Sequence, residues 1–180
     1  FVQIVGSHTN VVRVERNGET LLDKPFSEEA VQPPENRRLL TIENIIAFAD
    51  EAELDDVRAP IARQIEYNTA IAEAGLTGSY GAAIGRILLD SYGDSVQNRA
   101  KAWAAAGSDA RMNGCEKPVV INSGSGNQGM TASLPVIVYA RELGASEEQL
   151  YRALVVSNLV TIHLKTGIGS LSAYCGATSA

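Results

Sequence analysis

The sequence of 180 residues lacks several features that place a protein in a class at once. Its two cysteines, Cys115 and Cys175, are too few for a disulfide framework and are consistent with a reducing compartment. No apolar run is long enough to cross a bilayer, and no charged segment followed by an apolar one opens the chain as a signal peptide would. We therefore expect a cytoplasmic protein with no membrane partner.

Positive charge is also in short supply. Lysine and arginine number 15 against 21 aspartates and glutamates, so the net charge is -6 and the isoelectric point is about 5.0. A nucleic-acid-binding surface needs a basic patch or stripe, and the only adjacent basic pair is Arg37 with Arg38. This balance excludes nucleic acid as a partner. A hydrophobic share of 45% fits a globular chain with one good-sized core.

Residues that bind metal ions are few, and their spacing does not suit zinc. His8, His163, Cys115 and Cys175 form none of the paired-ligand patterns of zinc sites. His163 lies inside a helical pattern and is interpreted as an ordinary helix histidine.

The first part of the chain predicts a small β unit. Residues 1–22 contain short strand-like runs, and the pair Asn17 and Gly18 is a strong two-residue hairpin turn. Residues 23–38 form a polar, proline-bearing connector. We predict an α+β, mainly α fold, in which a small N-terminal β-hairpin unit is followed by a multi-helix domain with a glycine-rich turn in its core.

The predicted domains are residues 1–38 and residues 39–180. The first is the end of a small β-containing domain plus a connector, and the second is a helical domain that is truncated at its C-terminus. Phe1 is not a translation start, and residues 171–180 read as the opening of an apolar helix with no stop signal. The chain therefore reads as an internal fragment, and its apolar end is compatible with a homo-oligomer.

Helical periodicity follows the connector. The expected helices cover about residues 41–52, 55–75, 96–106, 131–143 and 146–167. Thr41 caps the first helix, and Ser146 with Gln149 forms a capping box that opens the last one. Pro135 is expected within about one turn of the start of its helix, where it costs little or produces a kink. The glycines of residues 75–85 favour close helix packing over the lining of a ligand site.

The most informative stretch is residues 122–129, with the sequence NSGSGNQG. Its glycines let the backbone turn sharply, so that several N–H groups point at one spot. The helix that follows adds its unpaired donors and the positive end of its dipole, an arrangement that suits a phosphate or an amino-acid carboxylate. The predicted substrate-binding residues of this turn are Ser123, Gly124, Ser125, Gly126, Asn127, Gln128 and Gly129.

The same stretch is compatible with other interpretations. A tight buried connection that needs glycine only for close packing explains the local sequence equally well. Residues 124–129 match G-x-G-x-x-G by letters, but no acidic residue follows about twenty residues later in a second strand. A dinucleotide site is therefore not favoured, and the absence of a Gly-Lys-Ser/Thr ending argues against a Walker A loop.

Polar residues outside the turn supply further candidates for substrate binding. His8, Thr9 and Asn10 interrupt two strands where packing gives no reason for polar groups, although a plain bulge or turn also explains them. Asp109 and Arg111 precede the predicted strand that leads into the turn. They can pair, hold the amino and carboxylate groups of a ligand, or cap the preceding helix, and capping is the default.

Five blocks in order carry a family resemblance, namely residues 5–10 (VGSHTN), 75–78 (GLTG), 108–112 (SDARM), 122–129 (NSGSGNQG) and 171–175 (LSAYC). Together they resemble the bacterial L-cysteine desulfidase family, which is related to the α-part of iron–sulfur L-serine dehydratases. The resemblance covers essentially the whole chain, and the glycine turn is its most specific element. The histidine block beside the hairpin favours the desulfidase branch.

This resemblance implies a [4Fe-4S] cluster held by three cysteines, with one open iron that acts as a Lewis acid while a base removes the α-proton. Cys175 matches the first cluster ligand, although its apolar and small neighbours alone would make it a buried, inert thiol. The resemblance places the other two ligands beyond Ala180 and a catalytic cysteine before Phe1, and Cys115 matches no ligand. The fragment alone is therefore expected to hold no intact cluster and to show no turnover.

Three functions follow as hypotheses. The first is a carbon–sulfur lyase that converts L-cysteine to pyruvate, ammonia and sulfide. The second is the α-part of an L-serine dehydratase, which differs only in releasing water from a hydroxyl group. The third is an amino-acid-binding domain without catalysis.

Overall fold

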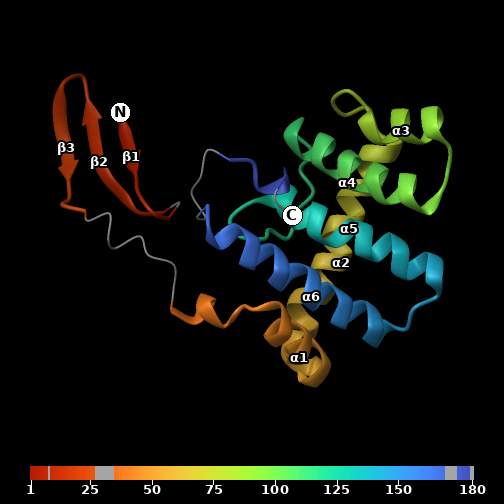
Figure 1. Cartoon of the computed structure of the whole chain (residues 1–180). Helices are drawn as coiled ribbons and strands as arrows, with labels where there is room; N and C mark the ends of the chain where they lie inside the picture. Colours follow the sequence, from red (N-terminus) through yellow and green to blue (C-terminus); the bar gives the residue numbers. More distant parts are fainter. Residues whose placement is uncertain (8, 27–34, 169–173, 179–180) are drawn as a thin grey trace.

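A computed structural model describes residues 1–7, 9–26, 35–168 and 174–178 of the chain (Figure 1). A small antiparallel sheet is followed by a bundle of helices, which confirms the predicted α+β, mainly α fold class. The sheet consists of β1 (Val2–Ile4), β2 (Val11–Arg16) and β3 (Glu19–Asp23), in the order β1-β2-β3.

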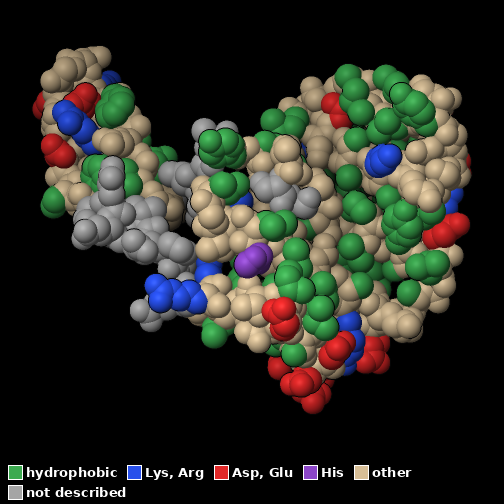
Figure 2. Space-filling view, in the orientation of Figure 1, with side chains coloured by type: hydrophobic (Ala, Val, Ile, Leu, Met, Phe, Trp, Pro, Cys, Tyr) green, Lys and Arg blue, Asp and Glu red, His purple; other side chains and the backbone are tan. Residues whose placement is uncertain are grey.

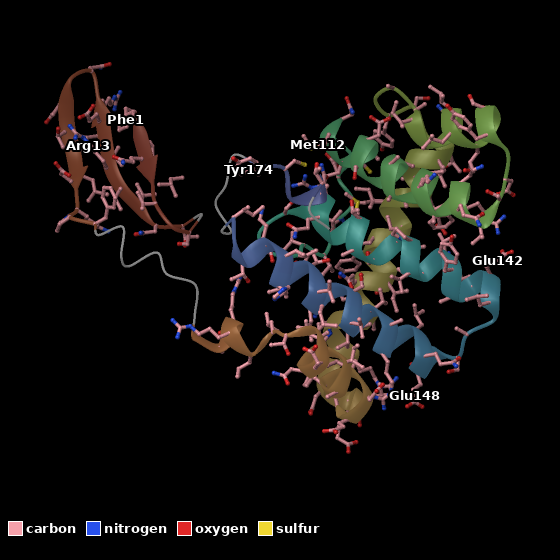
Figure 3. All side chains as sticks on the ribbon, in the orientation of Figure 1. Phe1, Arg13, Met112, Glu142, Glu148 and Tyr174 are labelled. Carbon is pink, nitrogen blue, oxygen red and sulfur yellow. The ribbon has the colours of Figure 1, made fainter. Side chains whose placement is uncertain are left out.

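The hairpin between β2 and β3 turns where the sequence predicts. Asn17 and Gly18 both have positive φ, 54° and 85°, which is the conformation of a two-residue type I′ turn. The strands pair with Val14 opposite Leu22, and Val12 is buried in the sheet. In Figures 1 and 3 the sheet, with Phe1 and Arg13, stands apart from the helices.

The helices begin after a short 3-10 segment, η2 (Glu35–Leu39). They are listed here in chain order: α1 (Ile42–Glu51), α2 (Leu54–Thr77), α3 (Ile84–Tyr92), α4 (Val96–Met112), α5 (Gly126–Leu143), α6 (Glu147–Thr166) and the short 3-10 helix η3 (Gly176–Thr178). The expected cap at Thr41 and the capping box of Ser146 and Gln149 are both present.

The core lies where α2, α4, α5 and α6 meet, with α5 between α4 and α6 (Figure 1). Its fully buried side chains come from several helices and include Ile71, Met130, Leu134, Ile137 and Leu154. The apolar stripes of these amphipathic helices face one another, so burial of this surface is the main source of stability.

Two glycines of the 75–85 stretch serve helix packing, as predicted. A Cβ at Gly75 would overlap the carbonyl oxygen of Ala106, and one at Gly85 would lie 2.6 Å from that of Ala102. Both carbonyls belong to α4, so α2 and α3 approach the backbone of α4 closely.

Several sequence-based boundaries are wrong. Helix α4 continues six residues beyond Ala106 to Met112, because its small residues keep packing against α2 and α5. Helix α5 already starts at Gly126, so Pro135 lies more than two turns inside it. The described part of the predicted C-terminal helix, residues 174–178, contains the short η3, and residues 171–173 and 179–180 lie outside the described residues.

The surface carries its negative charge unevenly. Acidic side chains gather at the lower end in Figure 2, over α1 and the first turns of α2 and α6, where Asp55, Asp56, Glu147 and Glu148 lie. Carboxylates in the first turn of a helix are favourably placed relative to its dipole. In the part of the chain that the structure describes, no helix combines the length and apolar character needed to span a membrane.

Candidate functional site

Residues 122–129 form a tight turn that runs directly into α5. Ser123 and Gly124 have φ of 46° and 84°, and they are flanked by a reciprocal backbone pair. The N–H of Asn122 donates to the carbonyl of Ser125 at 3.0 Å, and the N–H of Ser125 donates to the carbonyl of Asn122 at 2.9 Å. Ser125 then caps α5, because its Oγ accepts from the N–H of Gln128 at 3.2 Å.

Close packing is one reason for glycine in this turn. A Cβ at Gly129 would overlap the carbonyl oxygen of Val120, and one at Gly126 would lie 2.5 Å from Nε of Arg111. The interpretation as a tight connection therefore explains Gly126 and Gly129 on its own. It does not explain the polar residues among them.

The segment before the turn is not the strand that the sequence predicts. The carboxamide of Asn68, fully buried on α2, takes the place of a neighbouring strand: its Oδ1 accepts from the N–H of Val120 at 2.8 Å, and its Nδ2 donates to the carbonyl of Val120 at 3.3 Å. Nδ2 also donates to the carbonyl of Gly129 and to Oγ of Ser133. One side chain thus fixes the apolar run against the first turns of α5.

A second buried polar group fastens the other side of the turn. Asn158 on α6 and Gln64 on α2 exchange two hydrogen bonds of 2.7 and 2.9 Å between their carboxamides. Nδ2 of Asn122 donates to Oδ1 of Asn158 at 2.9 Å. Sequence reasoning missed Gln64, Asn68 and Asn158, although polar residues at core-facing helix positions were the available signal.

Backbone donors in the turn fall into two groups. The N–H groups of Asn122, Ser125, Gln128 and Gly129 are bonded within the turn. No hydrogen bond joins the N–H groups of Ser123, Gly124, Gly126 and Asn127 to another described residue. The first two amides of α5 are therefore available to a ligand, while the third and fourth are not.

Buried polar side-chain atoms without a partner gather at this turn. Within the described residues they are Thr69 Oγ1, Asn122 Oδ1, Ser123 Oγ, Gln128 Nε2 and Gln128 Oε1. All but the first belong to the turn, and Gln128 is fully buried. A buried polar group without a hydrogen bond costs about 1–3 kcal/mol, so such a cluster needs a reason.

Arg111 brings positive charge to the same place. Its Nη1 donates to Oδ1 of Asn127 at 3.1 Å, and its Nε lies close to the backbone of Gly126. It forms no ion pair with a described carboxylate. A cation at a helix N-terminus opposes the helix dipole, and an anion between the two would remove this conflict.

Asp109 points elsewhere. Its carboxylate accepts from the N–H groups of Ala82 and Ile84 at 3.4 and 3.2 Å and from Nδ2 of Asn113 at 3.1 Å. It therefore caps the start of α3. Asp109 does not pair with Arg111. It also does not cap the end of the preceding helix as predicted, because it lies inside α4, which continues to Met112.

Cys175 lies beside the turn, although 46 residues separate it from Gly129 in the sequence. Helix η3 packs on α5, and a Cβ at Gly176 would overlap Oε1 of Gln128 and approach Cβ of Ser125 at 3.2 Å. The Cys175 thiol is exposed, and its pKa is lowered chiefly by a hydrogen bond from the Thr178 hydroxyl. Backbone N–H groups of η3 add to the effect, so the expectation of a buried, inert thiol is wrong.

The candidates near the hairpin are only partly described. His8 lies outside the described residues. Thr9 and Asn10 belong to the connection between β1 and β2, where Nδ2 of Asn10 donates to the carbonyl of Val5 at 2.9 Å. That end of the sheet faces the helices in Figure 1, and the main contacts of each strand are with its neighbour in the sheet.

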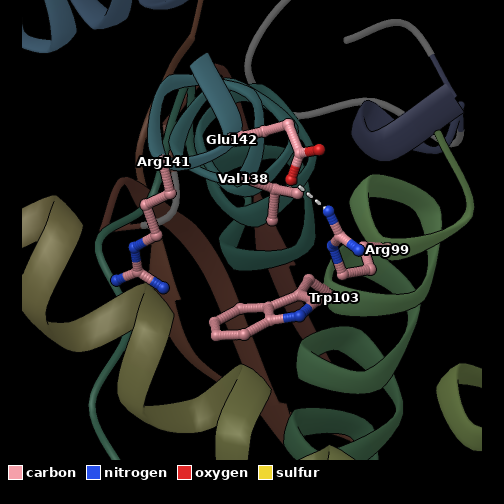
Figure 4. Close-up of a pocket in the computed structure, with 5 residues that line it drawn as sticks. All are labelled: Arg99, Trp103, Val138, Arg141 and Glu142. Atoms are coloured by element: carbon pink, nitrogen blue, oxygen red, sulfur yellow. Dashed lines mark hydrogen bonds and ion pairs between the residues drawn. The ribbon is translucent and has the colours of Figure 1, made fainter. Parts of the chain in front are cut away.

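Hollows lined by described residues occur away from the turn. One of about 290 Å³ lies between α4 and α5 (Figure 4), where the Arg141 guanidinium sits 5.3 Å from the ring centre of Trp103. Arg99 there is paired with both Asp94 and Glu142. Because Arg99 and Glu142 pair with each other and no buried, unpaired polar atom of the described residues lines it, this hollow makes a weaker ligand site than the turn.

Residues near the turn supply part of what an iron–sulfur cluster needs. Such a cluster is held by several cysteine thiolates. Among the described residues, no group of three or more His, Cys, Asp or Glu side chains could hold a metal ion. Cys175, with its lowered pKa and its place beside the turn, fits one ligand of a cluster.

A comparison with protein families decides the wider relationship. The model of the serine dehydratase alpha chain matches residues 10–180. The chain belongs to the serine dehydratase alpha chain family. The match includes both the glycine turn and Cys175, and it confirms the family relationship that the ordered sequence blocks predict.

Full-length relatives extend the comparison. The chain is 59% identical over 175 residues to UPF0597 protein DSY1109 of Desulfitobacterium hafniense. The aligned region covers 97% of this chain and 41% of the relative. The chain is 50% identical to UPF0597 proteins of Lachnoclostridium phytofermentans and Treponema denticola, and covers 43% of each. The chain thus spans about two fifths of the length of these relatives. No solved structure matches it.

Proposed function

We propose that the full-length protein is an α,β-eliminating lyase that acts on L-cysteine, and that residues 123–129 bind the carboxylate of this substrate. The reaction converts L-cysteine and water to pyruvate, ammonia and hydrogen sulfide. One observation carries the proposal, namely the group of buried, unpaired polar atoms at the head of α5. Membership of the serine dehydratase alpha chain family supports the reaction class.

The turn offers complementary groups for an amino-acid zwitterion. Its carboxylate accepts from the amides of Gly126 and Asn127 at the positive end of α5, and Arg111 adds charge from the side. The ammonium group donates to the unpaired Oδ1 of Asn122 and Oε1 of Gln128. Fixing both groups orients the α-hydrogen, so proximity and electrostatic preorganisation lower the barrier to its removal.

Cys175 is the residue of this chain that we assign to a [4Fe-4S] cluster. Its position against the head of α5 brings the thiolate to the proposed substrate site. A bound cluster supplies Lewis acidity toward the leaving group or the carboxylate. The remaining ligands come from parts of the full-length protein outside this chain, so the 180-residue chain by itself binds no intact cluster and shows no turnover.

His8, Thr9 and Asn10 remain proposed substrate-binding residues. The end of the sheet that carries Thr9 and Asn10 faces the helices. Asp109 stays in the proposal only as a support, since its carboxylate already holds the start of α3. We further propose that the division into residues 1–38 and 39–180 is a domain boundary, and that the full-length protein is cytoplasmic and self-associates.

L-Serine is the alternative substrate, and the name of the matching family favours it. The same turn would hold its carboxylate, and water would leave in place of sulfide. A domain that binds an amino acid without reacting is the alternative that needs no cluster.

Anaerobic assays of the full-length protein test these possibilities. With L-cysteine and L-serine as substrates, sulfide, pyruvate and iron are measured together. We expect equal yields of sulfide and pyruvate from L-cysteine and a slower release of pyruvate from L-serine. Faster turnover of L-serine would make L-serine the substrate. Binding of both amino acids without product formation would support an amino-acid-binding domain without catalysis.

A further inference from the structure

A lysine in the last turn of α6 has a buried side chain, and neither the sequence motifs nor the family match gives it a role. Lys165 lies in the last turn of α6 and is 3% exposed, although charged side chains are rarely buried without a partner. It forms no ion pair with a carboxylate among the described residues. A favourable position relative to the helix dipole explains a lysine in a last turn, but not its burial.

The buried stripe of α6 changes character along the helix. Near its start the stripe is apolar, with buried Tyr151 and Leu154, and farther along it becomes polar, with the partly buried Asn158 and the buried Thr161 and Lys165. Spacings of three and four residues keep these positions on one face of the helix. Asn158 already contacts Asn122, so the polar half of the stripe is directed toward the turn.

The position of Lys165 along α6 relates it to the head of α5. It lies about two helical turns beyond Asn158 on the same face of α6, and Asn158 accepts a hydrogen bond from Asn122 of the turn. Its charge is also the smallest of the causes of the lowered pKa of Cys175. Gly176, the next residue, lies against Gln128 and Ser125. The polar face of α6 and the segment around Gly176 therefore both border the head of α5.

We propose that the ammonium group of Lys165 binds the substrate carboxylate, together with Nε2 of Gln128. The proposal rests on the function given above. It assigns a partner to the cation of a largely buried lysine and to the buried, unpaired donor of Gln128, and both are groups that a carboxylate satisfies. The site then recognises the carboxylate from within the protein, whereas Arg111 approaches from the exposed side.

Titration calorimetry with unreactive probes tests the role of the charge. L-Alanine has the carboxylate and ammonium groups of the substrate but no leaving group, and L-alaninamide replaces the carboxylate with a neutral carboxamide. In the full-length protein, Lys165→Met should weaken L-alanine binding about 10- to 100-fold and leave L-alaninamide nearly unchanged. Lys101→Met, at an exposed position on α4, is the matched control and should change neither.

The outcomes separate this inference from the proposed function. If the wild type binds L-alanine and Lys165→Met binds it equally well, Lys165 has no part in recognition and the inference fails alone. If the wild type binds neither L-alanine nor L-cysteine, the proposed function fails and takes the inference with it. An equal loss of affinity for both probes would also overturn the role in carboxylate recognition.

Chemical modification of the wild type covers the case in which Lys165→Met does not fold. Acetylation by acetic anhydride is followed at individual lysines by mass spectrometry. L-Alanine should slow the acetylation of Lys165 several-fold and leave Lys101 unaffected, whereas L-alaninamide should protect neither. Absence of protection by L-alanine would contradict the proposal.

Discussion

Two glycine-bearing connections of this chain, residues 78–83 and residues 122–129, look alike in sequence and differ in how their polar groups are used. In the first, the Asp109 carboxylate accepts from the backbone of Ala82 and Ile84, and Arg86 donates to the carbonyl of Gly78 at 2.7 Å. These hydrogen-bonding groups of the first connection thus have partners within the protein. In the second, buried side-chain atoms at three positions lack partners.

The difference shows which observation distinguishes a site from a packing device. Glycine allows close approach in both connections, so glycine content does not separate them. Unpaired buried polar atoms reduce stability, and a protein that retains them at one place has a use for them there. Mutations should therefore damage the first connection only through stability, and the second through ligand binding as well.

The largest effect on stability is expected where a backbone atom blocks a side chain. Gly129→Ala places a Cβ against the carbonyl of Val120, which Asn68 also holds, and it should lower the free energy of unfolding by about 3 kcal/mol. Urea unfolding measures this loss.

Gly18→Ala is the control for glycine replacement without an obstacle, because nothing lies within 4 Å of the new Cβ. Its cost comes only from the positive φ of 85° and should be smaller, about 1 kcal/mol. If both variants lost the same free energy of unfolding, the carbonyl of Val120 would not obstruct a side chain at position 129.

The sequence predicted the elements of the fold well, because their signals are local. The hairpin turn at Asn17 and Gly18, the cap at Thr41 and the capping box at Ser146 each depend on neighbouring residues, and all three are present. The boundaries that failed depend on tertiary contacts. Residues 118–121 look like a strand but pair with the Asn68 side chain instead of another strand.

The candidate site was predictable in position but not in detail. Residues 122–129 stand out because glycine, serine and asparagine precede an apolar helix. The partners of Asp109, and the closeness of the segment with Cys175 and Gly176 to the turn, depend on contacts between segments far apart in the sequence. No local pattern contains that information, so the sequence left the pairing of Asp109 with Arg111 open.

The next effect concerns the satisfied connection. Asp109→Ala removes the acceptor for two backbone N–H groups at the start of α3 and should cost about 1–2 kcal/mol of unfolding free energy. Binding of L-alanine by the full-length protein should persist, because the carboxylate faces away from the turn. Loss of binding in a folded Asp109→Ala protein would move Asp109 into the substrate site.

Gln128→Met sharpens the comparison in the opposite direction. Methionine has a similar length without the unpaired carboxamide, so the variant should be as stable as the wild type or more stable by about 1 kcal/mol. Binding of L-alanine should fall at least about tenfold, since one hydrogen bond to a charged group is worth that much. Gln64→Met is the control for the loss of a paired carboxamide. Because Gln64 exchanges two hydrogen bonds with Asn158, its replacement should lower the free energy of unfolding of the protein.

A clear loss of stability in Gln128→Met would mean that this carboxamide is satisfied by the protein. The contrast between the two connections would then disappear, and with it the observation that carries the proposed function.

The smallest effect on stability is expected at Cys175, where the change is one of reactivity. The Thr178 hydroxyl and the amides of η3 stabilise the thiolate, so the pKa of Cys175 lies below its usual value and the thiolate persists to lower pH. Alkylation of Cys175 by iodoacetamide, followed by mass spectrometry across pH, should therefore reach half its maximal rate at a lower pH than alkylation of a free cysteine thiol measured alongside it. Thr178→Val removes the largest cause and should shift that midpoint upward. Thr166→Val, whose hydroxyl bonds instead to the carbonyl of Ile162, should not shift it. A midpoint at or above that of a free thiol would show that η3 does not hold the thiolate, and the head of α5 would lose its nearest candidate for a metal ligand.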